Sequence, residues 1–314
     1  MARQGKTDVP TGRRTISRRR LEAAVDGIRG AVTFNAPLKD YTSFRIGGPA
    51  DVLVEPADVD DVARLVRQTK AQKLPLFVVG GTNLLIRDKG IRGVVVHLGK
   101  LRTIREEPGS ILYAEGGVGM PTLIGYAIRH SLAGLEWAAG IPGTVAGCVV
   151  MNAGTRLGEM KDSVKAVRLV TRNGEIVEIP AAEIPFAYRR ATLPVGIVVG
   201  VWLQLKAGVR AEVETVVKDY LHYRRDTQPL TLPSAGCVFK NPSKDSAGRV
   251  IDLAGLKGAQ VGDAQVSDKH ANFIVNQGRA SAKDVLALIR KVRAAVARKT
   301  GVKLELELKV VGQA

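Results

Sequence analysis

The chain has 314 residues, a formal net charge of +17 at pH 7 and 45% hydrophobic residues. Its length predicts about two domains, and no apolar run approaches the roughly 20 residues that cross a bilayer. The basic start is not followed by an apolar segment, which argues against a secretory signal peptide. Because the chain contains only two cysteines, we expect no disulfide framework and a reducing, cytoplasmic location.

Part of the positive charge lies at the start of the chain. The first 20 residues carry seven Arg and Lys against a single acid, Asp8. We expect residues 1–30 to form a solvated, disordered extension. The excess elsewhere favours anionic partners, either small phosphorylated ligands or nucleic acid, and no membrane partner is expected. Aromatic residues make up 4% of the chain, which leaves little surface for stacking bases and makes nucleic acid the weaker alternative.

Residues 50–83 have the pattern of a strand–helix–strand unit. The apolar alternation over 50–55 predicts a strand, and Asp58 is a good cap for an amphipathic helix over 59–72. A short apolar strand over 76–79 then runs directly into a polar glycine loop, Gly80-Gly-Thr-Asn83.

Helices and strands are also expected along the rest of the chain. The expected helices cover 120–131, 209–223 and 281–299, the last with Ser281 as its cap and Asp284 three residues later. The expected strands cover 91–98, 111–114, 164–171, 176–179, 197–206 and 302–311. Asn173-Gly174 is a strong hairpin signal, and the helix over 209–223 is interpreted as the bridge to a second domain.

Two glycine-rich segments are candidates for binding a phosphorylated ligand. Gly80-Gly-Thr-Asn83 has neither the Rossmann glycine spacing nor a P-loop lysine, but glycines after a strand let backbone N–H groups approach a phosphate. The second segment, residues 134–154, is rich in small residues and poor in charge, with Gly140, Gly143 and Gly147 at its centre. The alternatives are an ordinary turn and close packing of a helix on a sheet. Together, two such loops can hold a pyrophosphate between them.

Eight motifs in sequence order resemble those of the UDP-N-acetylenolpyruvoylglucosamine reductase family. They include Gly80-Gly-Thr-Asn-Leu-Leu85, Ala187-Tyr-Arg189 and Ala235-Gly-Cys-Val-Phe-Lys-Asn-Pro242. The full set covers residues 41–51, 80–85, 140–154, 187–189, 233–242, 254–258, 266–276 and 301–307. The resemblance therefore extends over nearly the whole chain, from about Thr33 to Gly312.

The resemblance implies an α+β fold with two domains. A two-part FAD-binding domain of the vanillyl-alcohol oxidase and p-cresol methylhydroxylase type would cover residues 31–208, with lobes at about 31–90 and 91–208. A smaller α+β substrate-binding domain would cover residues 209–314. Only seven residues separate Arg189 from the strand expected at 197, so the chain resembles the shorter type without a tyrosine-loop insertion.

The family's activity is the NADPH-dependent reduction of UDP-N-acetylglucosamine enolpyruvate to UDP-N-acetylmuramate, a step in peptidoglycan precursor synthesis. The resemblance implies that FAD is bound non-covalently and that NADPH and the enolpyruvate substrate use one cleft in turn. Two alternatives remain open at this point. One is another FAD oxidoreductase on the same fold, and the other is a basic protein that binds nucleic acid.

Three catalytic residues follow from matching the family's motifs. Arg189 would hold and polarise the substrate carboxylate, because a planar guanidinium suits bidentate contact. Cys237, where many relatives have serine, would give a proton to the substrate carbon; an unperturbed thiol has a pKa of about 8.5. Glu307 would assist protonation or polarisation. Arg190 is the alternative to Arg189 for the first of these roles, and Glu305 is the alternative to Glu307 for the last.

The resemblance also implies a set of binding residues and no metal site. The expected FAD contacts are Arg45, Val79, Gly80, Gly81, Thr82, Asn83, Leu84, Ile141, Gly143, Thr144, Gly147, Ala153, Gly154 and Val198. The expected substrate contacts are Arg225, Asn241, Lys257 and His270.

Overall fold

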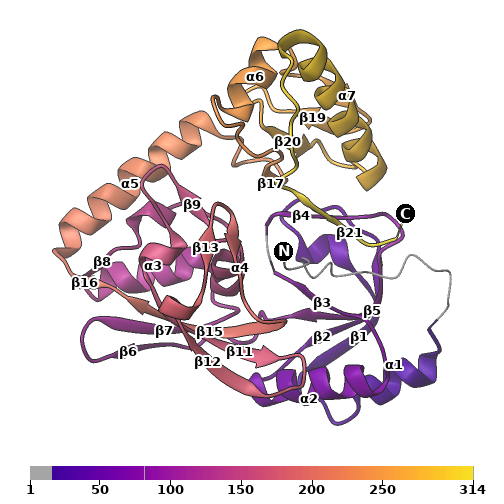
Figure 1. The fold of residues 1–314 in the computed structure, drawn as a ribbon, viewed down its shortest axis with the longest axis vertical. Helices are drawn as coiled ribbons and strands as arrows, with labels where there is room; N and C mark the ends of the chain where they lie inside the picture. Colours follow the sequence, from indigo (N-terminus) through magenta and orange to yellow (C-terminus); the bar gives the residue numbers. More distant parts are fainter. Residues whose placement is uncertain (1–15, 81, 314) are drawn as a thin grey trace.

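The computed structural model describes residues 16–80 and 82–313, which form three bodies (Figure 1). Two lobes lie beside each other in the lower part of the view, and a C-terminal unit lies above them. The expected FAD contact Gly81 and the first 15 residues of the expected extension lie outside the described residues. None of the described helices combines the length and the apolar character that crossing a bilayer requires.

A four-stranded sheet in the order β1-β2-β5-β3 forms the first lobe. Its strands are β1 (Ala31–Pro37), β2 (Pro49–Glu55), β5 (Ile91–His97) and β3 (Leu76–Val79). Strands β2, β5 and β3 are parallel and β1 is antiparallel to β2. Helix α2 (Val59–Ala71) begins at its predicted cap Asp58, and the 3-10 turn η1 (Leu38–Tyr41) follows β1. The predicted strand–helix–strand unit is therefore confirmed.

The predicted disordered extension is wrong over the part of it that the structure describes, residues 16–30. Residues Arg18–Val25 form helix α1, and Leu21 and Ala24 from this helix are buried in the hydrophobic core shared with α2. The basic composition hid this helix, because its two core residues are three positions apart within a run of charged side chains.

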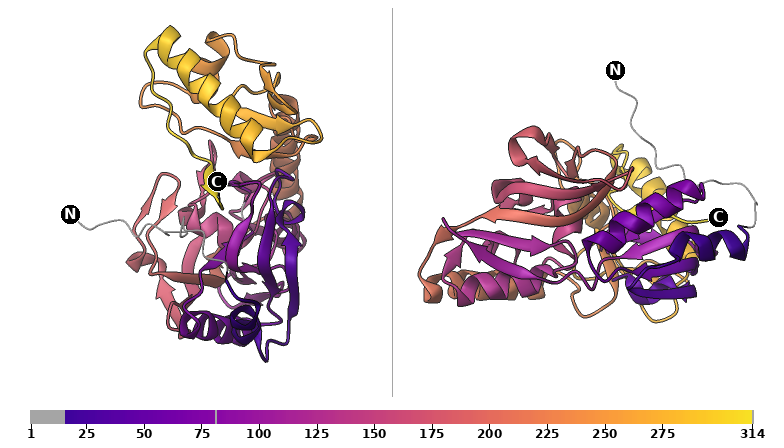
Figure 2. Two further views of the ribbon diagram at one scale, coloured as in Figure 1. Left: turned by 90° about the vertical axis from the view of Figure 1, so that its right-hand side faces the viewer. Right: turned by 90° about the horizontal axis from the view of Figure 1, so that it is seen from below.

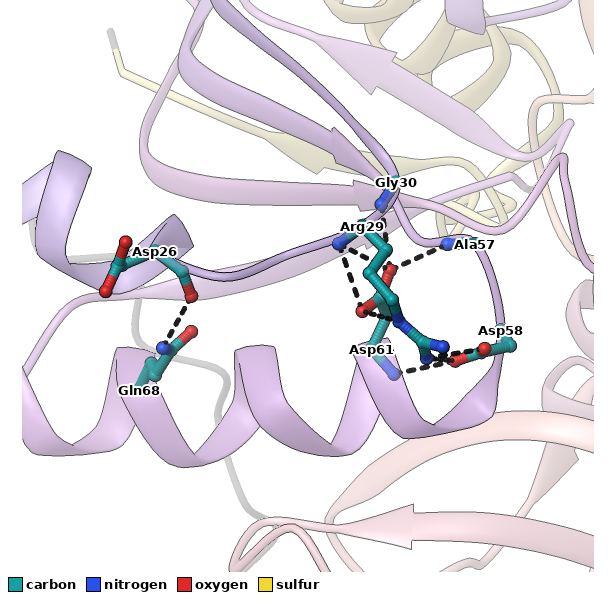
Figure 3. Close-up of polar contacts among 7 residues, drawn as sticks. All are labelled: Asp26, Arg29, Gly30, Ala57, Asp58, Asp61 and Gln68. Atoms are coloured by element: carbon teal, nitrogen blue, oxygen red, sulfur yellow. Dashed lines mark hydrogen bonds and ion pairs between the residues drawn. The ribbon is translucent and has the colours of Figure 1, made fainter.

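The buried carboxylate of Asp61 fixes the segment between α1 and β1 (Figure 3). Asp61 is fully buried in the first turn of α2. Its oxygens accept hydrogen bonds from three backbone N–H groups, those of Arg29, Gly30 and Ala57. The Arg29 side chain also reaches Asp61 and Asp58. Burial acts to raise the pKa of Asp61, but the backbone donors outweigh burial, and the net pKa is below its usual value.

A five-stranded antiparallel sheet, in the order β12-β11-β15-β7-β6, forms the second lobe. Its strands are β6 (Ile104–Glu107), β7 (Ile111–Glu115), β11 (Val164–Thr171), β12 (Ile176–Pro180) and β15 (Gly196–Gln204). The lobe also contains α3 (Met120–Arg129), α4 (Val145–Val150), η2 (Glu136–Ala138), η3 (Met160–Asp162) and η4 (Ala181–Glu183). Three short pairs complete it: β8 (Leu132–Ala133) with β16 (Lys206–Ala207), β9 (Gly154–Thr155) with β10 (Gly158–Glu159), and β13 (Phe186–Ala187) with β14 (Arg190–Ala191). The predicted hairpin at Asn173-Gly174 joins β11 to β12.

Helix α5 (Arg210–Thr227) is longer than predicted and leads from the second lobe toward the C-terminal unit, as Figure 2 also shows. Its Val217 and Tyr220 belong to the core of the lobes rather than to that of the C-terminal unit. By packing, the C-terminal unit therefore begins after Thr227, beyond the boundary at residue 209 that the sequence favoured.

The C-terminal unit is an antiparallel sheet in the order β17-β20-β19-β18, covered by two helices. The strands are β17 (Ser234–Cys237), β18 (Gln260–Val261), β19 (Ala264–Val266) and β20 (Phe273–Asn276). The helices are α6 (Ala247–Leu253) and α7 (Ala282–Thr300), and α7 has the predicted Ser281–Asp284 capping box.

The long strand predicted over 302–311 is wrong. Only β21 (Lys309–Val311) is a strand there, and it pairs in parallel with β4 (Leu84–Ile86), next to the first glycine loop. Residues before it run as an extended segment with a single bridge, between Phe239 and Leu306. The alternating leucines predicted a continuous strand because burial alternates there, but the backbone changes partners from the C-terminal unit to the first lobe.

Candidate active site

The two glycine-rich segments lie against each other across the two lobes. Thr144 Oγ1 donates a hydrogen bond to the carbonyl oxygen of Gly80 at 3.3 Å, and Thr82 Oγ1 donates to that of Pro142 at 3.5 Å. Gly143 has a φ of +104°, and a Cβ at this position would lie 3.3 Å from Thr82 Cγ2. The contact needs a glycine at Gly143, both for its backbone conformation and for its lack of a side chain.

A buried polar atom without a partner marks this junction. Asn83 Oδ1 is buried and accepts no hydrogen bond from the described residues, whereas Asn83 Nδ2 donates to the Glu307 carbonyl oxygen at 2.9 Å. Buried acceptors are rarely left unpaired in folded proteins, so a bound group that offers an N–H donor fits this position. The junction therefore fits a cofactor with ring N–H groups and a pyrophosphate.

The other expected FAD contacts differ in what they can offer. Val79, Leu84 and Val198 are buried, with side chains in the hydrophobic cores, so only their backbones can face a ligand. Gly147 N–H already donates to Thr144 Oγ1, the N-cap of α4, a short helix that the sequence did not predict. The remaining expected contacts lie at or near the two segments or on the loop after η1: Ile141, Ala153, Gly154 and the exposed Arg45.

The three expected catalytic residues come together from three parts of the chain. Arg189 Nε donates to Glu307 Oε1 at 3.0 Å, and both side chains are largely buried. Burial raises the pKa of Glu307, while Arg189 acts in the opposite direction. Of the two alternatives, Glu305 is exposed and pairs with Lys240, and Arg190 is exposed on β14.

Cys237, the last residue of β17, lies in the same cluster. Burial, followed by the negative charge of Glu307, raises the pKa of the Cys237 thiol to about 12. Arg189, Arg224 and Asn272 act in the opposite direction. The thiol is therefore far less acidic than the unperturbed value suggests and remains protonated at neutral pH.

Tyr188 is a member of the cluster that the sequence did not single out. Burial and the neighbouring Glu307 raise the pKa of the Tyr188 phenol, with a further contribution from Cys237. The Arg189 guanidinium carbon lies 5.1 Å from the centre of the Tyr188 ring. In the sequence, the position of Tyr188 directly before Arg189 was the only signal that it belongs to this cluster. About half of the residue is exposed.

Asn83 and Asn152, one from each glycine-rich segment, bind the backbone near the two residues of the ion pair, Glu307 and Arg189. Asn83 binds the Glu307 carbonyl oxygen, as described. Asn152 Nδ2 donates to the Ala187 carbonyl oxygen at 3.1 Å, and Asn152 Oδ1 accepts from the Lys161 N–H at 3.0 Å. Asn152 is buried and has a φ of +40°, a conformation that asparagine adopts more readily than most residues.

The expected substrate contacts have other partners among the described residues. Asn241 Oδ1 accepts from the Ala247 N–H, and Lys257 forms an ion pair with Asp252 at 2.8 Å. His270 Nδ1 accepts from the Asn272 N–H, and burial lowers the pKa of His270. The Arg225 side chain is exposed, and its carbonyl oxygen accepts from Lys269 Nζ. Of the four, Asn241 is the one tied to the catalytic cluster, through a backbone contact to Tyr188.

Within the described residues, no group of three or more His, Cys, Asp or Glu side chains is placed to hold a metal ion. What the residues offer is a junction of two glycine segments beside an Arg–Glu pair and a protonated thiol.

Comparisons with known proteins agree with this arrangement. Residues 50–180 match the FAD binding domain family, and residues 228–311 match the family described as UDP-N-acetylenolpyruvoylglucosamine reductase, C-terminal domain. The fold and the site thus define an FAD-binding oxidoreductase, with an FAD-binding domain of the vanillyl-alcohol oxidase type followed by a second α+β domain.

Whole-chain relatives make the assignment specific. UDP-N-acetylenolpyruvoylglucosamine reductase 2 of Symbiobacterium thermophilum is 47% identical over 90% of this chain and 93% of its own length. The corresponding reductase of Caldanaerobacter subterraneus subsp. tengcongensis is 43% identical over 90% of this chain and 95% of its own length. The crystal structure of the Thermus caldophilus reductase superposes with a TM-score of 0.77 at 39% identity, covering 91% of this chain and 100% of that structure. The chain belongs to the UDP-N-acetylenolpyruvoylglucosamine reductase family.

Proposed function

We propose that this protein catalyses the NADPH-dependent, FAD-mediated reduction of UDP-N-acetylglucosamine enolpyruvate to UDP-N-acetylmuramate in the cytoplasm. The observation that carries the proposal is the meeting of Arg189, Glu307 and Cys237 in a chain that matches these reductases over nine-tenths of its length. Both cysteines, Cys148 and Cys237, are free, which is compatible with a reducing compartment.

The two glycine segments would hold FAD, with their backbone N–H groups toward the pyrophosphate. Asn83 Oδ1, the unpaired acceptor, would take an N–H of the cofactor. When bound, FAD supplies the hydride that the substrate double bond receives. NADPH and the enolpyruvate substrate would occupy the same cleft in turn, and Arg225, Asn241, Lys257 and His270 would contact the nucleotide part of the substrate.

Arg189 would bind the substrate carboxylate. Hydride addition to the double bond builds negative charge toward that carboxylate, so a fixed cation there lowers the barrier. Only the Nε of Arg189 donates to Glu307, and its terminal nitrogens make no hydrogen bond to the described residues. Two parallel donors are thus free for a bidentate contact.

Cys237 would complete the reduction by giving its proton to the neighbouring carbon. The S–H bond breaks, a C–H bond forms, and the electron pair remains on sulfur until water restores the proton. A pKa of about 12 keeps the thiol protonated before the reaction, which an acid catalyst requires. Glu307, which faces both Arg189 and the thiol, would hold the guanidinium in place.

Separate observation of the two half-reactions tests the proposal. We expect NADPH to bleach the flavin absorbance of the anaerobic protein, and the enolpyruvate substrate to restore it quickly. Enolpyruvate that fails to reoxidise the reduced protein, under conditions where oxygen does so, would contradict the proposed activity.

A further inference from the structure

The loop after η1, residues 42–48, joins the first lobe to the C-terminal unit. Its Phe44 and Ile46 are buried in the hydrophobic core of that unit. Asn276 Nδ2, from β20, donates a hydrogen bond to the Phe44 carbonyl oxygen at 3.2 Å. Ser43 directly precedes Phe44, so its backbone is held in place against the C-terminal unit by a fully buried neighbour.

The Ser43 hydroxyl lies between two carbonyl oxygens from different parts of the molecule. Ser43 Oγ is 2.7 Å from the Ser234 carbonyl oxygen and 3.3 Å from the Thr82 carbonyl oxygen. A hydroxyl has one hydrogen to donate, so the bond to Ser234 is the strong one and the bond to Thr82 is the weak one. Ser234 begins β17, the strand that ends at Cys237, and Thr82 belongs to the first glycine segment. One side chain therefore connects the thiol strand to that segment.

Strand β17 needs an anchor at its first residue. Within the described strands it lies at the edge of its sheet and pairs with β20. The pairing register shifts between Ser234 and Cys237, where Gly236 has a φ of +72°. Such a bulge interrupts the ladder and leaves a residue unpaired. Beyond the thiol, the backbone N–H and carbonyl oxygen of Val238 both form hydrogen bonds, to two different segments. The stretch that carries the thiol is thus fixed at its far end by these bonds and at its near end by Ser43.

We propose that Ser43 is a positioning residue whose hydroxyl holds the thiol strand at a fixed place beside the first glycine segment, so that the proton donor faces the carbon to be reduced. Asn83 and Asn152 make comparable ties to the backbone at Glu307 and two residues before Arg189. Ser43 supplies the third tie, to the third catalytic segment. The proposal rests on the proposed roles of the thiol and of the glycine segments, and Ser43 itself touches no reacting atom.

The reactivity of the thiol measures this anchoring without any turnover. The full-length FAD-bound protein is treated with iodoacetamide at about pH 9, and peptide mass spectrometry separates Cys237 from Cys148. We expect Ser43→Ala to speed alkylation of Cys237 by about fivefold, the change in a local opening equilibrium that one typical hydrogen bond gives. Cys148, which is buried in the core of the lobes, should react no faster than in the wild type.

Thr42→Val is the matched control, because it removes a hydroxyl from the same loop and keeps the shape of the side chain. Thr42 Oγ1 donates to the Ile46 carbonyl oxygen at 3.2 Å and to that of Lys39 at 3.4 Å, both within one short stretch of chain. Its loss should leave alkylation of Cys237 unchanged. Ser43→Thr, which keeps the hydroxyl, should react like the wild type. Unchanged alkylation in a folded Ser43→Ala protein, or an equal acceleration in Thr42→Val, would overturn the proposal.

The half-reactions connect the anchoring to catalysis. Ser43→Ala should slow substrate reduction by about tenfold or more, because a misplaced catalytic group loses much of its effect, and it should leave flavin reduction by NADPH largely intact. Ser43→Thr should restore the rate. In a Cys237→Ala background, Ser43→Ala should have little further effect, and an equal effect in both backgrounds would contradict a role through the thiol. If the wild-type protein fails to reduce the enolpyruvate substrate, the proposed function fails, but the alkylation rates still decide whether Ser43 holds the thiol strand.

Discussion

Arg189 holds a left-handed backbone conformation, with a φ of +57°, in the turn between β13 and β14. Few non-glycine residues adopt it, and such positions persist only where the surroundings fix them. Here the Asn152 bond to Ala187, two residues earlier, and the ion pair with Glu307 both hold the turn. The conformation aims one arginine inward and leaves the next, Arg190, in solvent.

Replacing the thiol separates acid catalysis from flavin chemistry. We expect Cys237→Ala to leave flavin reduction by NADPH largely intact and to slow substrate reduction by about 100-fold or more, the range for a lost general acid. Cys237→Ser, which keeps an acidic proton, should recover activity. Rapid-mixing measurement of each half-reaction checks this, and equal slowing of both steps would argue against the proton-donor role.

Motif matching selected Arg189, Cys237 and Glu307, which lie in one cluster, but it did not single out Arg224, the buried neighbour of Arg225. A signal for Arg224 was present in the sequence. Val213, Val217 and Tyr220 share one stripe of α5, and Arg224 continues that stripe at the next helical repeat. An arginine within the apolar stripe of a helix is predicted to be buried, whereas a neighbouring arginine outside the stripe is predicted to be exposed. The carbonyl oxygen that Arg224 binds, in contrast, comes from a distant part of the chain that no local pattern indicates.

At the scale of elements, two side-chain amides connect the cofactor segments to the catalytic pair. Asn83 lies at the end of the first segment and binds the backbone of Glu307, while Asn152 closes the second and binds the backbone of Ala187. A shift of either segment would therefore be transmitted to one member of the ion pair.

Removing the Asn152 amide should misplace Arg189. In Asn152→Ala, the Ala187 carbonyl and the Lys161 N–H lose their partner, and each hydrogen bond lost costs about 1 kcal/mol. We expect a lower melting temperature and a raised KM for the enolpyruvate substrate. Asn35→Ala is the matched control, because Asn35 also has a positive φ, +53°, but is exposed. A substrate KM that does not change in a folded Asn152→Ala protein would contradict the positioning role.

The contact between the glycine segments should be sensitive to one methyl group. Gly143→Ala places a Cβ 3.3 Å from Thr82 Cγ2 and strains a backbone with φ of +104°. We expect FAD affinity, measured by flavin fluorescence, to fall by about tenfold or more, which is a loss of about 1.4 kcal/mol. Gly109→Ala carries comparable strain, at φ of +82°, without any atom within 4 Å, so its FAD affinity should stay normal.

Patterns in the sequence predicted most of the elements, and each miss has its own physical cause. The strand–helix–strand unit, the Asn173-Gly174 hairpin and the capped helix α7 have strong local signals, and all are present. Helix α4 was missed because its six residues lie within a glycine-rich run. The strand predicted over 302–311 was too long. Alternating apolar residues indicate which side chains are buried, but a strand also needs a continuous backbone partner.

At the scale of the whole molecule, Asp61 links stability to pH. The folded-state pKa of Asp61 is lowered, so its contribution is present above the unfolded value of about 3.9 and is lost as the pH falls through the folded value. Asp61→Asn should reduce the stability at pH 7 by about 1–3 kcal/mol, because the buried backbone donors lose a charged acceptor.

Thermal melting across pH checks this expectation. The difference between wild type and Asp61→Asn should narrow below about pH 4, where the wild-type carboxylate begins to be protonated. Asp60→Asn, on the exposed side of the same helical turn, should melt like the wild type at every pH. A constant difference down to the lowest pH would show that the charge of Asp61 is not what stabilises the segment.

The pairing of β21 with β4 means that the C-terminal unit is not an interchangeable module. Phe44, Ile46 and Leu85, from the first lobe, complete the hydrophobic core of that unit, and Asn276 binds the Phe44 carbonyl oxygen across 232 positions of sequence. A fragment cut at the boundary that sequence comparison finds, near residue 228, would expose this core. We expect residues 228–313 alone to bind hydrophobic dyes and to lack cooperative melting. Recombination between relatives should therefore preserve function only when these distant segments are exchanged together.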